Sequence, residues 1–74
     1  MTKTPKQKAY AVMDRWFRDK PALLSFTLDG EAGGYTVVIK TTARRTHTTV
    51  GDTPMEAVTR MQQVYKDMKK VNKL

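Results

Sequence analysis

The sequence predicts an α+β domain in which a three-stranded antiparallel sheet carries an N-terminal and a C-terminal helix on one face. Two segments with apolar residues at helical spacing lie at the two ends of the chain. Between them, three short segments alternate apolar and polar side chains with the two-residue period of strands. The predicted order is therefore α-β-β-β-α, and the 74 residues suffice for a single small domain.

The first helix is expected over residues 5–20. Thr4 is placed to cap this helix, Pro5 suits the first helical position, and Gln7 completes a capping box. Pro21 ends the helix, because the residue before a proline is pushed out of helical geometry. The apolar stripe consists of Ala9, Val12, Met13, Trp16 and Phe17.

Three strands are expected over residues 22–29, 35–42 and 45–50. The segments ALLSFTLD and YTVVIKT alternate clearly, and THTTV is a more polar third strand. The loop DGEAGG is rich in turn-forming residues, which predicts a hairpin between the first two strands. The segment TTARR forms the second reversal.

The second helix is expected over residues 53–71. Thr53 is its predicted cap, Pro54 lies in the first turn, and Glu56 completes a second capping box. Its apolar stripe consists of Ala57, Val58, Met61, Val64, Tyr65, Met68 and Val71.

Both helices are expected on the same face of the sheet, because each has one apolar stripe and an antiparallel sheet can keep its other face in water. The side chains expected under the helices are Leu24, Phe26, Leu28, Tyr35, Val37, Ile39 and Val50. The open face is expected to show Ser25, Thr27, Thr36, Val38, Lys40, His47 and Thr49. A register shift of one residue would exchange these faces.

The charge balance is the strongest bulk signal for function. The chain has 14 Lys and Arg against 7 Asp and Glu, a net charge of +7. Such a charge attracts nucleic acid, anionic membranes or acidic proteins, although solubility alone is the alternative explanation. No apolar run is long enough to cross a bilayer, and none follows the basic start MTKTPKQK, so we expect a cytoplasmic protein that does not associate with a membrane.

The sequence argues against an enzyme. The chain has no cysteine, His47 is its one histidine, and no serine or carboxylate pair lies in a recognised catalytic arrangement. Glycines 30, 33 and 34 are not followed directly by a helix, so they do not form a phosphate-binding loop. Ligands for a metal site are also lacking. We therefore expect no catalysis and no cofactor.

Arg44 and Arg45, at the second reversal, are the leading candidates for contact with an acidic partner. Two guanidinium groups on a hairpin tip suit phosphate oxygens or a guanine edge. Lys40 and His47 add charge and hydrogen-bond donors nearby. The second helix adds Lys66, Lys69 and Lys70. The alternative reading is that a charged tip protects a sheet edge and that lysines complement the dipole of a helix end.

The order of elements, the apolar central strand YTVVIK and the polar turn before a long second helix resemble the double-stranded-RNA-binding domain. The resemblance covers Thr4 to about Lys70 and implies both helices on one sheet face. That family has a lysine cluster at the start of its second helix. Here the segment reads GDTPMEA, with Asp52 and Glu56 and no lysine. The resemblance therefore implies the topology and no binding residue.

The segment YTVVIKTTARRTHTTVGDTPMEAV is also similar in outline to phage integrase arm-binding domains, which pair a three-stranded sheet with a helix. A short, basic, cysteine-free domain suits a viral protein, such as an accessory protein of a phage or mobile element. We expect a non-enzymatic protein that binds nucleic acid, either DNA or RNA. The alternative is a phage-encoded inhibitor or adaptor that docks on an acidic host protein. The sequence does not determine the oligomeric state.

Overall fold

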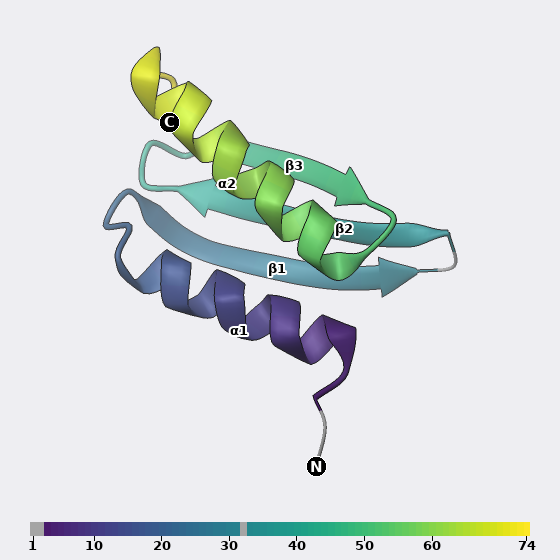
Figure 1. Cartoon of the computed structure of the whole chain (residues 1–74). Coiled ribbons are helices and arrows are strands. Elements are labelled where there is room, and N and C mark those ends of the chain that lie inside the picture. The colour runs from purple at the N-terminus through teal and green to yellow at the C-terminus, as the bar shows by residue number, and fades with distance from the viewer. Residues whose placement is uncertain (1–2, 32) are drawn as a thin grey trace.

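The computed structural model describes residues 3–31 and 33–74 and has the predicted α-β-β-β-α order (Figure 1). The strands form one antiparallel sheet in the order β1-β2-β3, with both helices beside the same face, so the α+β prediction is confirmed. The elements are α1 (Pro5–Arg18), β1 (Leu23–Glu31), β2 (Gly34–Thr41), β3 (Thr46–Gly51) and α2 (Pro54–Lys70). The predicted first hairpin loop, 29–34, is shorter than expected because both strands extend into it, and its position 32 lies outside the described residues.

Both helices begin at threonine caps, but only one of the two predicted capping boxes forms. Thr4 Oγ1 accepts a hydrogen bond from the Gln7 amide at 3.1 Å, and Gln7 Oε1 accepts one from the Thr4 amide at 2.9 Å. Thr53 Oγ1 likewise accepts from the Glu56 amide at 3.1 Å. The Glu56 carboxylate instead pairs with Arg60, at 2.7 Å, because that guanidinium lies one turn further along the same helix face.

The core lies between the sheet and the two helices. Its buried side chains are Ala9, Met13, Leu23, Leu28, Val37, Ile39, Ala57, Val58, Met61 and Tyr65. The helices also pack on each other, and Trp16 of α1 meets Tyr65 of α2 edge to face, with ring centroids 5.1 Å apart. Val12 lies outside this contact and is exposed, contrary to its place in the predicted stripe.

At the start of β1, a bulge reverses the predicted burial of two neighbouring leucines, Leu23 and Leu24. The pairing with β2 shifts between Leu23 and Ser25, so Leu24 is the extra residue. Leu23 is 6% exposed and belongs to the core, whereas Leu24 is 63% exposed. The prediction that Leu24 faces the helices is therefore wrong.

The predicted orientation of β3 is also wrong. His47 lies opposite Ile39 and Thr49 opposite Val37, and residues directly opposite each other in an antiparallel pair share a face. Since Ile39 and Val37 are buried, His47 and Thr49 lie on the covered face. Thr49 Oγ1 confirms this by donating a hydrogen bond of 2.9 Å to the carbonyl of Ala57 in α2.

The other residues of β3 consequently lie on the open face. Val50 is 58% exposed and pairs with Thr36, and Thr46 pairs with Lys40. Gly51 takes the last covered position, where a Cβ would lie 2.6 Å from the Ala57 amide nitrogen. A glycine therefore lets the end of β3 approach the first turn of α2.

Candidate functional site

The turn between β2 and β3 is tied down by hydrogen bonds at its base. The carbonyl of Thr41 accepts from the Arg44 amide at 3.0 Å, and the Thr41 amide donates to the Arg45 carbonyl at 2.9 Å. The Thr41 side chain is 1% exposed, and its Oγ1 accepts from the Arg45 amide at 3.2 Å. The Thr42 amide donates to the Ala22 carbonyl at 2.9 Å, which joins the turn to the connection between α1 and β1. The two arginines therefore stand on a fixed backbone.

Arg44 has a left-handed backbone conformation, with φ at 63°. Among the described non-glycine residues, only Arg44 and Asn72 have positive φ, and asparagine adopts this region readily. A three-residue hairpin loop closes on a residue in this conformation, a position usually filled by glycine. For a side chain such as arginine the conformation costs roughly 1–2 kcal/mol. An exposed arginine thus occupies a position where a glycine would be more stable.

Several cations gather at the end of the molecule where this turn lies. The α1–β1 connection, the turn and the carboxyl half of α2 all reach this end (Figure 1). Two contacts confirm the arrangement: the hydrogen bond from Thr42 to Ala22, and the Lys20 ammonium 5.9 Å from the centroid of the Tyr65 ring in α2. We call this group the basic end, and it consists of Lys20, Lys40, Arg44, Arg45, Lys66, Lys69 and Lys70.

The cations of the basic end take no part in the ion pairs found within residues 3–31 and 33–74. Those pairs are Arg18 with Asp14, at 3.0 Å, and Arg60 with Glu56, at 2.7 Å. Asp67, the carboxylate nearest in sequence to the α2 lysines, accepts instead from the Gln63 side chain at 3.1 Å. The basic end therefore presents its positive charge to solvent.

Six of the seven predicted contact residues lie at the basic end, and all six are exposed. His47 does not join them. It lies on the covered face, half-buried, and its Nε2 is buried without a hydrogen-bond partner in the described part of the chain. The expectation that His47 adds a donor beside the arginines on the open face is wrong.

Cations do not collect on the open face of the sheet. Among its residues whose side chains the structure describes, Lys40 and Asp29 are charged. The others are Ser25, Thr27, Thr36, Val38, Thr46, Thr48 and Val50. Lys20 is not among the predicted contact residues, although the antiparallel order already implies that the first helix ends beside the second hairpin.

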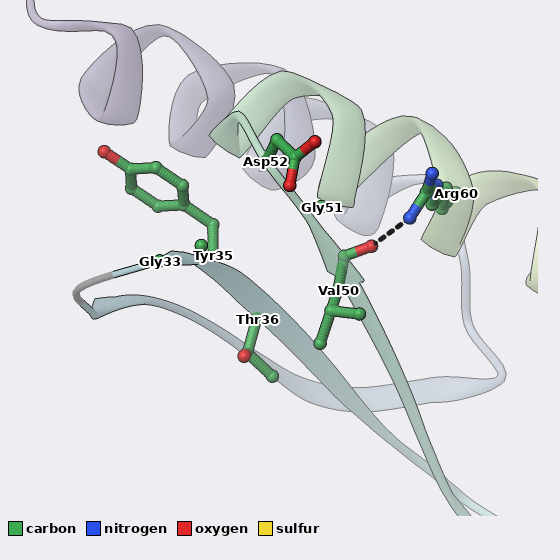
Figure 2. Close-up of a pocket in the computed structure, with 8 residues that line it drawn as sticks. Gly33, Tyr35, Thr36, Val50, Gly51, Asp52 and Arg60 are labelled. Atoms are coloured by element: carbon green, nitrogen blue, oxygen red, sulfur yellow. Dashed lines mark hydrogen bonds between the residues drawn. The ribbon is translucent and has the colours of Figure 1, made fainter.

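A cavity of about 290 Å³ lies at the opposite end of the β2–β3 hairpin (Figure 2). Tyr35 and Thr36 come from β2, Val50 and Gly51 from β3, and Arg60 from α2. The remaining lining residues are Gly33, Gly34 and Asp52. The Arg60 guanidinium donates to the Val50 carbonyl at 2.7 Å and closes one side of the cavity.

Among the residues that the structure describes, no helix is both long and apolar enough to span a membrane. The His, Asp and Glu side chains of the same residues form no group of three or more suited to a metal ion.

Comparison of the chain with protein-family models, with curated proteins and with solved structures finds no match.

Proposed function

We propose that this chain is a non-enzymatic cytoplasmic protein that binds DNA or RNA through its basic end. The observation that carries the proposal is the left-handed backbone at Arg44. Strained non-glycine residues cluster at functional sites, where the rest of the fold offsets their cost. Here the strain holds a guanidinium at the tip of a turn that Thr41 and Ala22 fix in place.

The chemistry of the basic end suits a phosphate backbone. Arginine forks onto phosphate oxygens with two parallel hydrogen bonds, and lysine adds point charges around it. Each phosphate that is neutralised releases counterions, so binding weakens linearly, on logarithmic axes, as salt increases. The proposed affinity is therefore mainly electrostatic.

The topology supports a relation to the double-stranded-RNA-binding domain only at the level of the order of elements. The start of α2, with Asp52 and Glu56, lies at the end of the molecule opposite the β2–β3 turn (Figure 1). The proposed contact therefore uses the carboxyl end of α2 rather than its start. A phage or mobile-element accessory role remains part of the proposal on composition alone.

The direct test is a titration of labelled duplex DNA and duplex RNA at two salt concentrations. The variant to compare is Arg44→Gly/Arg45→Ala, because glycine tolerates the conformation at position 44 and keeps the turn intact. We expect weaker binding and a salt slope smaller by about 2 for this variant.

The matched control is Lys6→Ala/Lys8→Ala, which removes two exposed charges near the start of α1. This control should change binding much less, since its charges lie away from the basic end. Equal losses for the two double variants would mean that net charge alone matters. No binding by the parent protein at low salt would rule the proposal out.

The second candidate is a protein that docks on an acidic host protein, and an exposed apolar patch on the open face, such as Val38 and Leu23, would favour it. Leu23 is buried in the core, so it does not contribute to such a patch. A pull-down from nuclease-treated host lysate separates the candidates. Partners lost after nuclease treatment indicate nucleic acid, and partners retained indicate a protein.

A further inference from the structure

Lys20 differs from the other cations of the basic end, because aromatic rings hold its side chain. The other cations of this group are exposed, whereas Lys20 is half-buried. Its ammonium lies 5.4 Å from the centroid of the Trp16 ring and 5.9 Å from the centroid of the Tyr65 ring. Both distances fall within the range of about 6 Å in which an aromatic face attracts a cation. Two rings therefore hold the charge of Lys20 in one place.

The two rings are themselves fixed by the packing of the helices. Trp16 of α1 and Tyr65 of α2 meet edge to face, with an angle of 85° between the ring planes. Tyr65 is 5% exposed and belongs to the core. The position of the Lys20 ammonium therefore follows from the contact between α1 and α2.

The backbone around Lys20 is joined to the β2–β3 turn. The Lys20 amide donates to the Phe17 carbonyl, and the Lys20 carbonyl accepts from the Leu23 amide, both at 3.0 Å. Two residues after Lys20, the Ala22 carbonyl accepts from the Thr42 amide of the turn at 2.9 Å. The α1–β1 connection and the β2–β3 turn accordingly lie side by side (Figure 1). Lys20 is thus a fixed cation beside a fixed turn.

We propose that Trp16 positions Lys20 for contact with a phosphate of the nucleic acid, and that Lys20 contributes more to binding than any other lysine of the basic end. This inference rests on the proposed function. The rings lie against one side of the ammonium, so its other N–H donors remain free for phosphate oxygens. A lysine that is ordered before binding loses less side-chain entropy in the complex than a mobile one. Lys66, exposed on α2, has no such ring contact among the described residues.

The contact with the rings is tested first without nucleic acid. In NMR spectra, the ring currents should shift the Hε resonances of Lys20 upfield of those of Lys66. Trp16→Leu should remove most of this shift, whereas Tyr65→Phe keeps a ring in place and should preserve it. Hε resonances of Lys20 that coincide with those of Lys66 would overturn the contact, whatever the protein binds.

A double-mutant cycle then measures the effect on binding to labelled duplex DNA or RNA. Lys20→Gln should weaken binding several-fold more than Lys66→Gln, which removes the same charge from α2. Trp16→Leu leaves every charge in place, so it should weaken binding without changing the salt slope. In the Lys20→Gln background, Trp16→Leu should have no further effect on binding.

Equal losses of affinity for Lys20→Gln and Lys66→Gln would overturn the inference while the proposed function stands. The same holds if Trp16→Leu weakens binding equally with and without Lys20, because the loss would then be structural. The comparison of Lys20→Gln with Lys66→Gln is decisive even where Trp16→Leu lowers the stability of the fold. Absence of binding by the parent protein would remove the proposed function and this inference together.

Discussion

At the residue scale, Arg44 and Thr41 determine how the tip of the second hairpin is presented. Arg44 adopts φ of 63°, and Thr41 is buried below it with its hydroxyl accepting from the Arg45 amide. The positive φ of Arg44 lowers the stability of the fold, and the hydrogen bond between Thr41 and Arg45 offsets part of that loss. Both features act on the backbone of the turn.

Replacing Arg44 with glycine should raise the free energy of unfolding by about 1 kcal/mol, because glycine adopts positive φ without the steric penalty of a side chain. Urea denaturation measures this change. Arg45→Gly is the matched control, since Arg45 does not have positive φ, and it should leave stability unchanged or lower it. A loss of stability in Arg44→Gly would show that the arginine side chain contributes more than its conformation costs.

Thr41→Val should loosen the turn while preserving its shape, because valine matches threonine in volume but cannot accept the hydrogen bond from Arg45. The expected cost is about 1 kcal/mol. Hydrogen exchange at the Arg45 amide should speed up in Thr41→Val and stay slow in Thr41→Ser, which keeps the hydroxyl. Unchanged exchange in the valine variant would mean that the backbone bonds alone hold the turn.

At the element scale, the contact between β3 and α2 orients the second hairpin. Thr49 bonds to the Ala57 carbonyl, and Gly51 lies directly against the Ala57 amide. These contacts turn Thr49 and Gly51 toward the helices and leave Val50 in solvent. The edge strand is therefore fixed by its fit against a helix and not by its one large apolar residue.

Gly51→Ala should destabilise the fold by about 1–3 kcal/mol, since the added methyl group would overlap the backbone of α2 and force the helix away from the strand. Thermal or urea unfolding measures the loss. Gly34→Ala should cost less, because its Cβ would lie 3.2 Å from the Gly51 carbonyl and needs only a small shift. Equal stability of Gly51→Ala and the parent protein would contradict the tight approach.

The sequence was sufficient to predict the kind and order of the elements, because their periodicity and threonine caps are local signals. The faces of β3 could not be predicted in this way. THTTV carries little apolar contrast, so its register depended on the turn geometry at Arg44 and on the fit of Gly51 against α2. The bulge at Leu24 could not be predicted either, because Leu23 and Leu24 are both apolar and the sequence does not show which of them is buried.

The candidate site was predicted in part. The arginine pair and the lysines of α2 were identified from charge, and their exposure agrees with that choice. His47 was misplaced together with the rest of β3. The cavity beside Asp52 was not predicted, because the residues that line it come from three separate elements.

At the scale of the whole molecule, the topology determines where the charged side chains lie. Antiparallel strands and two helices bring the ends of α1, β2 and α2 to one end of the fold (Figure 1). Cations that lie far apart in the sequence thereby act together, while Asp52 and Glu56 lie at the opposite end of the hairpin.

Lys69→Ala/Lys70→Ala should weaken binding to duplex DNA or RNA and reduce the salt slope by about 2, since both lysines belong to the basic end. Filter binding or fluorescence anisotropy at two salt concentrations measures this. Lys6→Ala/Lys8→Ala again serves as the control with the same change in net charge. A slope that does not change in Lys69→Ala/Lys70→Ala would remove α2 from the proposed contact.

The edge-to-face contact between Trp16 and Tyr65 joins the first helix to the last one. During synthesis the part of α1 that packs on α2 must therefore wait for α2 to emerge before it is covered. At about 5–20 residues per second, that delay lasts on the order of several seconds. The hairpins are complete earlier in translation, but Tyr65 must clear the ribosome before the helix pair can close.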